Sequence, residues 1–245
     1  MGDKTSIEWT DATWNPVTGC TKVSSGCKFC YAERITERWG QDFKKIILHP
    51  DRLEQPLHWR KPRRIFVNSM SDLFHQTVPD EFILQVFDVM TRCNGIYLDS
   101  PARHIFQVLT KRPARMCQFM EKFVAKSGTD WLAEHGQRIW LGTSCEDQPA
   151  ADERIPWLRK TPAAVRFLSL EPLLGPIDLM KYLTAHCQEC GEELALEFEK
   201  KHQWGHPCPS LKTTCESYLE RSLHWVIVGG ESGGPPKRAL VAKCL

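Results

Sequence analysis

Short apolar runs alternate along the chain with longer stretches whose apolar residues recur at helical spacing. The short runs are typical of buried β-strands, and they cover residues 65–67, 104–109, 138–142, 166–170 and 224–228. Strands that alternate with helices indicate a parallel sheet whose neighbouring strands are joined by right-handed crossovers. With one further strand from the N-terminal segment, the pattern predicts an α/β fold, an open and partial (β/α)6 TIM-like barrel.

The helical stretches carry their apolar residues on one face. A proline at position 79 opens the longest of them, and its core face holds Phe82, Ile83, Val86, Phe87 and Met90. Similar stretches lie around Met116 to Phe123 and around Ile155 and Leu158, and a shorter one follows Cys30 and stops at Gly40. We expect these faces to pack against the sheet.

Each predicted strand is followed by polar residues or glycines. The strand at 65–67 is followed by Asn68, Ser69, Ser71 and Asp72, and the strand at 104–109 by Thr110, Lys111 and Arg112. The strand at 138–142 is followed by Thr143, Ser144 and Glu146, the strand at 166–170 by Glu171, and the strand at 224–228 by Gly229, Gly230 and Glu231. Loops that follow parallel strands collect at one mouth of a barrel, where barrel enzymes place their chemistry. We therefore expect a site at this mouth, although any single residue of the series would also fit a capping role.

Three cysteines, Cys20, Cys27 and Cys30, form a Cys-x6-Cys-x2-Cys pattern within residues 19–31. Three thiolates from one loop are able to hold three corners of a cubane iron–sulfur cluster (4Fe–4S) and to leave the fourth iron open. Gly26 is free to take a positive φ, and Phe29 offers an apolar wall. Two alternatives stay open, namely a zinc site, for which a fourth ligand is not nearby, and buried thiols that bind no metal.

Several motifs together carry a resemblance to a known family. They are the cysteine pattern and residues 7–16, 69–75, 109–113, 169–175 and 228–233. In these segments the chain resembles the phage three-Cys-motif family (DUF5131) of uncharacterised proteins, a radical S-adenosylmethionine (SAM) relative. The resemblance implies that SAM chelates the open iron and that an electron from the cluster breaks a carbon–sulfur bond of SAM. It does not supply the substrate.

The resemblance also implies roles for the residues that follow the strands. Asn68, Ser69, Ser71 and Asp72 would meet the methionine end of SAM, Ser144, Glu146 and Glu171 its ribose or ammonium, and Gly229 and Gly230 its adenine. Lys111 and Arg112 would bind the SAM carboxylate or a substrate phosphate, and the alternative is an exposed pair at the barrel rim. Two departures stand out, since most radical SAM enzymes use Cys-x3-Cys-x2-Cys and have Gly-Gly-Glu where this chain has residues 68–72.

A cysteine-rich insertion separates the fifth and sixth strands. Cys187, Cys190, Cys208 and Cys215 indicate a small zinc ribbon, with thiols that bind no metal or a second iron–sulfur cluster as alternatives. We expect three parts: a partial barrel over 1–180, the insertion over 181–222, and the last strand with a short tail over 223–245. Family members usually continue through a further helix, so we expect a C-terminus that is cut short.

Composition and charge narrow the class of protein. With 42% hydrophobic residues and a net charge of +2, the chain is expected to be globular rather than disordered or strongly attracted to polyanions. Eleven cysteines without a charged and apolar leader favour metal-bound thiolates in a reducing cytoplasm. No apolar run approaches the length of a membrane span, so no membrane partner is expected.

These observations together predict a radical SAM enzyme that cleaves SAM reductively and receives its electron from an external donor. Nucleic acid is the first candidate substrate, on account of the phage family and the basic run at residues 60–64. The alternative is a non-catalytic module that uses its cysteines for structural metal and binds nucleic acid. Catalytic residues and oligomeric state are not assigned by the sequence.

Overall fold

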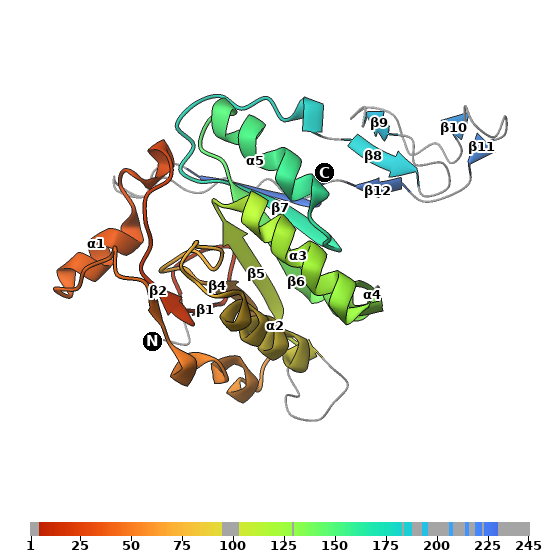
Figure 1. Cartoon of the computed structure of the whole chain (residues 1–245). Coiled ribbons are helices and arrows are strands. Elements are labelled where there is room, and N and C mark those ends of the chain that lie inside the picture. Colours follow the sequence, from red (N-terminus) through yellow and green to blue (C-terminus); the bar gives the residue numbers. More distant parts are fainter. Residues whose placement is uncertain are drawn as a thin grey trace.

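One sheet of six parallel strands forms the centre of the computed structural model (Figure 1). The structure describes residues 5–94, 103–128, 130–182, 184–187, 193–195, 206–207, 214–215, 219–221 and 223–229. In spatial order the strands are β1 (Ala12–Trp14), β4 (Arg64–Val67), β5 (Ile105–Thr110), β6 (Ile139–Ser144), β7 (Val165–Leu170) and β13 (Trp225–Val228). The predicted parallel sheet is confirmed. Because β1 and β13 form its two edges, the sheet is not closed.

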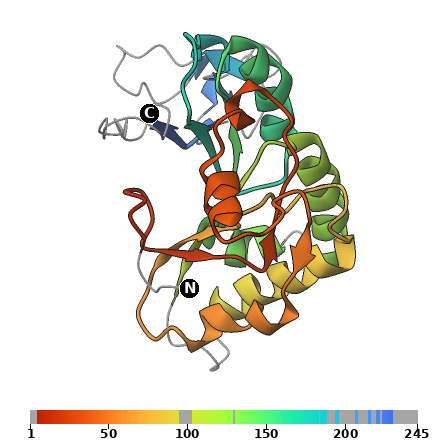
Figure 2. The same cartoon turned by 90° about the vertical axis from the view of Figure 1, so that its left-hand side faces the viewer.

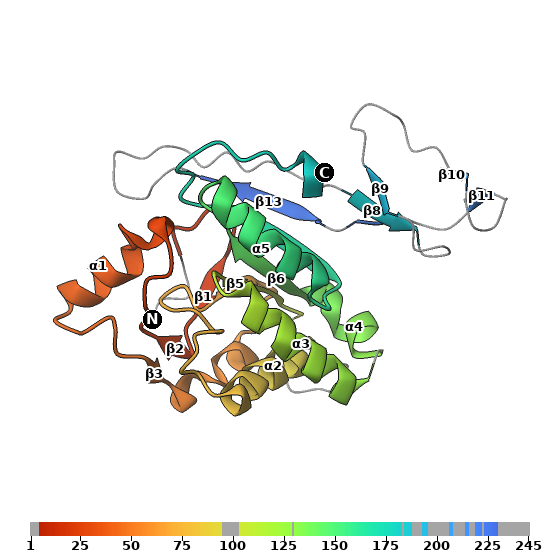
Figure 3. The ribbon, with the colours of Figure 1, turned by 45° about the horizontal axis from the view of Figure 1, so that its top comes forward.

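Helix α2 (Asp80–Asn94) follows β4, α3 (Pro113–Ser127) follows β5, and α5 (Gln148–Lys160) follows β6. The short helix α4 (Asp130–His135) lies between α3 and β6. Figures 2 and 3 show α2, α3 and α5, coloured yellow to green, together on one side of the sheet. Pro113 starts α3, and Asp147 caps α5 by accepting a hydrogen bond from the Ala150 amide at 3.0 Å. In the described part of the chain, no helix combines the length and the apolar character needed to cross a bilayer.

The two faces of the sheet bury different residues, because side chains alternate along each strand. Ile65 and Val67 of β4 belong to the main core, which also contains the predicted apolar face of α2. Phe66, between them in sequence, instead packs with Phe167, Ile227 and Trp9 in a smaller cluster. The sheet is therefore covered by apolar side chains on both faces.

Phe167 and Gly142 fit together within this smaller cluster. A Cβ atom on Gly142 of β6 would lie 2.5 Å from Cε1 of Phe167, a ring that is only 1% exposed. A buried ring at that distance has to move before a methyl group can enter. Glycine at position 142 thus allows the aromatic ring of β7 to lie across the neighbouring strand.

The segment between β1 and β4 begins at the carboxyl edge of the sheet. It contains β2 (Val17–Thr18), η1 (Ser25–Cys27), α1 (Tyr31–Arg38), β3 (Ile47–Leu48), η2 (Pro50–Arg52) and η3 (Gln55–His58). β2 pairs with β3 in antiparallel fashion, and Gly19 forms an isolated bridge with Ser71, which follows β4. The first cysteine of the pattern, Cys20, is thereby held next to the end of β4.

The described residues of the predicted insertion, with Met180 directly before it, form η5 (Met180–Tyr182) and the short strands β8 (Thr184–Cys187), β9 (Glu193–Ala195), β10 (His206–Pro207), β11 (Thr214–Cys215) and β12 (Leu219–Arg221). Antiparallel pairing joins β12, β8 and β9 into one small sheet and β10 and β11 into another (Figure 1). Cys190 and Cys208 lie outside the described residues, and only the backbone of Cys187 and Cys215 is described. The zinc ribbon and the division into three parts stay predictions.

We expect Gly142→Ala to lower the free energy of unfolding by about 1–3 kcal/mol, because the added methyl group overpacks the contact with Phe167. Urea unfolding measures this change. Gly175→Ala is the matched control, since its Cβ would meet only Asp147 Cβ at an ordinary 3.9 Å. The double variant Gly142→Ala with Phe167→Leu should lose less stability than the sum of the two single variants. Simple additivity would show that the ring does not occupy this space.

Candidate functional site

The predicted cysteine loop, residues 19–31, lies on the chain segments that follow β4, β5 and β6. A Cβ atom on Gly26 would be 2.9 Å from Cδ of Glu146, so the loop backbone rests on that carboxylate. Ser25 Oγ donates a hydrogen bond to Asp147 Oδ2 at 3.3 Å. Arg112, which follows β5, donates to Cys20 Sγ at 3.7 Å. These contacts place the loop at the carboxyl edge of the sheet.

Asp72 is the buried acceptor at the centre of this edge. Its Oδ1 accepts hydrogen bonds from the Phe74 amide at 3.0 Å and from the Thr110 hydroxyl at 2.7 Å. Its Oδ2 accepts from the Lys111 amide at 3.1 Å and from Arg112 Nη1 at 2.9 Å. The carboxylate therefore connects the segment after β4 to the segment after β5. The predicted contact between Asp72 and SAM stays a prediction.

Arg112 carries this connection into the cysteine loop. In addition to Asp72 and the sulfur of Cys20, its guanidinium donates through Nη2 to the Thr21 carbonyl and to the Thr21 hydroxyl, both at 3.1 Å. The same hydroxyl pairs with His75 Nε2 at 2.8 Å. A planar guanidinium that spans three acceptor groups fixes their relative positions. Arg112 therefore anchors the start of the cysteine loop.

The three cysteines of the loop are free and half-buried. Burial raises the pKa of Cys20 to about 11, with further raising by Asp72 and Cys27 and opposing effects of Arg112. The unligated Cys20 is thus a protonated thiol at neutral pH. Among the residues that the structure describes, no three His, Cys, Asp or Glu side chains are arranged to hold a single metal ion.

Glu146, directly beneath Gly26, is fully buried. Burial raises its pKa, but Lys111, Ser24 and Arg154 outweigh this effect and the net pKa is lowered, so the side chain is ionised at neutral pH. Its Oε2 is 3.0 Å from Arg154 Nη1 and 3.4 Å from Lys111 Nζ. Oε1 of Glu146 and Oγ of Ser24 are buried without a hydrogen bond of good geometry in the described structure. Arg154 also donates to the Ser144 carbonyl at 2.7 Å.

Glu171 and Gly229 form a second part of the edge, after β7 and β13. A Cβ atom on Gly229 would lie 1.9 Å from Glu171 Oε1, so only glycine allows this contact. Burial raises the pKa of Glu171, Glu8 adds to this effect, and a hydrogen bond from the side chain of Trp9 opposes it. Gly230 lies outside the described residues.

Tyr31 links the cysteine loop to the segment that follows β4. Its hydroxyl donates a hydrogen bond to the Ser69 carbonyl. Burial is the main cause that raises its pKa, and the charges of Cys30 and Glu171 add to this effect. The neutral hydroxyl is therefore a permanent donor in the middle of the edge.

The polar residues after β4 hold the turn itself. Asn68 has a φ of 61°, a left-handed conformation that asparagine tolerates, and its Oδ1 accepts from the Val17 amide at 3.3 Å. Ser71 Oγ donates to the Val17 carbonyl at 2.8 Å. Ser69 exchanges hydrogen bonds with the Asn15 amide group at 3.1 and 3.2 Å. These side chains shape the backbone beside Cys20, and their proposed contacts with SAM stay predictions.

The basic run lies at the other end of the strands. Residues 60–64 lead into the amino end of β4, whereas the cysteine loop lies at the carboxyl edge. Arg64 Nη2 pairs with Asp11 Oδ1 at 3.1 Å, and Arg63 lies 4.8 Å from the ring centre of Trp59. The run therefore does not contribute phosphate-binding groups to the candidate site.

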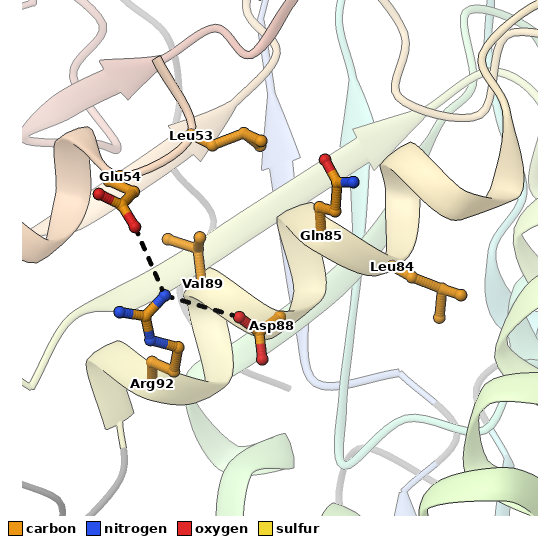
Figure 4. Close-up of a pocket in the computed structure, with 7 residues that line it drawn as sticks. All are labelled: Leu53, Glu54, Leu84, Gln85, Asp88, Val89 and Arg92. Carbon is orange, nitrogen blue, oxygen red and sulfur yellow. Dashed lines mark ion pairs between the residues drawn. The ribbon is translucent and has the colours of Figure 1, made fainter. Parts of the chain in front are cut away.

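A depression of about 380 Å³ lies between α2 and the segment of Leu53 and Glu54, and no residue of the cysteine loop lines it (Figure 4). Arg92 is drawn there between two acids, with Nη1 at 3.8 Å from Glu54 and 3.7 Å from Asp88. Exposed ion pairs of this kind contribute little binding energy. We assign no role to this depression.

A model of the family described as "Protein of unknown function (DUF5131)" matches residues 4–242 of the 245-residue chain. The chain belongs to the DUF5131 family. Comparison with curated proteins gave no match, and comparison with solved structures gave none. The family assignment from the cysteine pattern and the flanking motifs is confirmed, while the activity of DUF5131 proteins is not shown by it.

The most informative residue that the sequence analysis missed in this DUF5131 protein is Arg154. It is 3% exposed on the buried face of α5, four residues after Ala150 and four before Leu158. An arginine at the apolar spacing of a helix signals a buried partner, because an unpaired buried charge is costly. The sequence analysis also did not predict that Tyr31 and Trp9 act as hydrogen-bond donors, because aromatic side chains are usually interpreted as core residues.

We expect Asp72→Asn in this DUF5131 protein to lower the free energy of unfolding by about 3–5 kcal/mol, because it leaves the buried Arg112 guanidinium without its counter-ion. Asp11→Asn is the matched control. It removes a partner of the half-exposed Arg64, where an ion pair is worth about 0–1 kcal/mol. Urea unfolding of both variants checks the difference. Equal losses would contradict the structural role of the Asp72–Arg112 pair.

Glu146 and Glu171 are expected to respond to pH with opposite signs. The lowered pKa of Glu146 stabilises the fold above the unfolded-state pKa, and this stabilisation is lost as pH falls through the folded-state value. The raised pKa of Glu171 favours the fold below the unfolded-state pKa, and this contribution is lost as pH rises through the folded-state value.

Urea unfolding of Glu146→Gln and Glu171→Gln at a series of acidic to neutral pH values tests these signs. Relative to the parent protein, Glu146→Gln should be most destabilising at neutral pH, and Glu171→Gln should become relatively more stable as pH rises. Parallel pH profiles for the two variants would contradict the assignment.

Proposed function

We propose that this DUF5131 protein is a radical SAM enzyme that holds a 4Fe–4S cluster on Cys20, Cys27 and Cys30. The observation that carries the proposal is the position of three free thiols on one loop across the carboxyl edge of a parallel sheet. This is the edge at which α/β enzymes build their sites. The cysteine spacing supplies three thiolates and leaves one iron for a non-protein ligand.

We favour a cubane over a single zinc ion as the group on these cysteines. Ligands of one zinc ion have to converge on one point, whereas a cubane presents separate iron corners to separate thiolates. Cys20 and Cys27 are close enough for Cys27 to raise the pKa of Cys20, and Arg112 donates to the sulfur of Cys20. Ligation requires the thiolate, which a guanidinium at 3.7 Å stabilises.

The surroundings also offer groups suited to SAM. The buried Oε1 of Glu146 and Oγ of Ser24 have acceptor capacity for an ammonium. Lys111 would bind the carboxylate, and the backbone at Gly229 would allow close approach of adenine. When bound, a reduced cluster and SAM together would supply the electron transfer that cleaves a carbon–sulfur bond of SAM.

The sheet topology supports the finer fold assignment. Six strands in chain order, with α2, α3 and α5 on one side, are what an open (β/α)6 barrel requires. In such a barrel the inner face carries the smaller cluster of Trp9, Phe66, Phe167 and Ile227. The site would then lie above this cluster, at the carboxyl mouth.

We extend the proposal to nucleic acid as substrate and to an external electron donor.

The decisive experiment is anaerobic reconstitution of the full chain with iron and sulfide. We expect about four irons and four sulfides per chain, and release of 5′-deoxyadenosine from SAM after chemical reduction. Cys20→Ala, Cys27→Ala and Cys30→Ala should each abolish this product. Cys117→Ala is the matched control, because Cys117 is a buried free thiol of α3 outside the loop.

Two results would overturn the proposal. One is that the parent protein binds no more iron than a variant in which Cys20, Cys27 and Cys30 are all replaced by alanine. The other is cleavage of SAM by Cys20→Ala at the parental rate. Stoichiometric zinc without SAM cleavage would instead support the non-catalytic module.

A further inference from the structure

A pocket of about 440 Å³ lies beside the cysteine loop, between the end of α1 and the β2–β3 pair. Thr18 and its β3 partner Ile47 line it, together with Gly19, immediately before Cys20, and Trp39 from the end of α1. Figure 3 shows α1, β2 and β3 together at one edge of the molecule. Its volume lies within the range of about 300–1,000 Å³ found for small-molecule sites.

Trp39 is the most exposed large apolar side chain among the described residues, at 62%. Its position follows from the end of α1, because the helix stops at Arg38 and Gly40 turns the chain with a φ of 70°. Ile47, on β3, is also 38% exposed in the same pocket. An indole face and an aliphatic side chain are thus available to a flat ring.

The charged groups of the pocket favour an anion. Lys45 is exposed and makes no ion pair within the described residues, and Arg52, whose Nε lies 4.0 Å from Asp51 Oδ2, adds a second cation. Asp42 is the single acid in the lining, and its Oδ1 already accepts from the Lys44 amide at 2.9 Å. His49 pairs with the Thr18 hydroxyl at 2.8 Å. An aromatic face next to cations is the combination that binds a base and its phosphate.

We infer that this pocket binds a nucleotide, with the base stacked on Trp39 and the phosphate beside Lys45 and Arg52. The Gln41 amide, also in the lining, is able to donate to and accept from a base edge. The nucleotide is either free or part of a single strand, since both present the same base and phosphate. The inference goes beyond the radical SAM reaction and deepens the nucleic-acid part of the proposed function, but binding here needs neither the cluster nor SAM, so its failure and that of SAM cleavage are distinguishable.

Fluorescence anisotropy of the full-length protein tests the inference with two probes, a labelled single-stranded oligonucleotide and a labelled adenosine monophosphate. We expect Trp39→Ala to weaken binding about tenfold or more and Trp39→Phe to retain most of it, since stacking needs only an aromatic face. Lys45→Ala should weaken binding and reduce the salt dependence by about one phosphate contact. Both side chains are exposed, so circular dichroism should show unchanged folding.

Trp157→Ala is the matched control. Trp157 is 38% exposed and lies 5.3 Å from the Lys160 ammonium on α5, outside the pocket. Its replacement should leave binding unchanged. The inference is overturned if neither probe binds, if Trp39→Ala binds as the parent does, or if Trp157→Ala loses as much. Binding of both probes, or of the oligonucleotide alone, assigns a single strand, and binding of the mononucleotide alone assigns a free nucleotide. Each result is independent of SAM cleavage.

Discussion

The buried ion pair between Asp72 and Arg112, 2.9 Å apart, joins three chain segments that are distant in sequence. Burial of two charges is expensive, and such a pair is tolerated only when further hydrogen bonds satisfy both groups. Asp72 accepts from Phe74, Thr110 and Lys111, and Arg112 donates to Thr21. With both partners held in this way, the guanidinium has one position, and the sulfur of Cys20 lies against it.

A second buried network supports the far side of the cysteine loop. Glu146, held by Arg154 and Lys111, forms the surface on which Gly26 rests. The loop therefore touches paired charged groups at its start and middle, and an additional side chain at position 26 would break the contact. Rigid support of this kind is what a ligand set needs when its own residues lie in a loop.

The sequence predicted the strands and helices well because their signals are local. Apolar runs predicted β4–β7, and a one-sided apolar face predicted α2. The structure has each of these elements near its expected position. The contacts of the site depend on tertiary packing, so they were not visible in the sequence. The hydrogen bonds of Asp72 and Asn68 to backbone groups, and of Asp72 to Arg112, depend on segments that are distant in sequence, and their predicted contacts with SAM stay predictions. The donation from Arg154 of α5 to Glu146 and from Tyr31 of α1 to Ser69 likewise arises only from packing.

The most direct test of the account is the electron paramagnetic resonance spectrum of the reduced, reconstituted protein before and after addition of SAM. We expect the signal of a reduced 4Fe–4S cluster that changes when SAM is added, because SAM would occupy the iron without a cysteine ligand. A cluster signal that SAM leaves unchanged, or the absence of such a signal in a protein loaded with iron and sulfide, would contradict it.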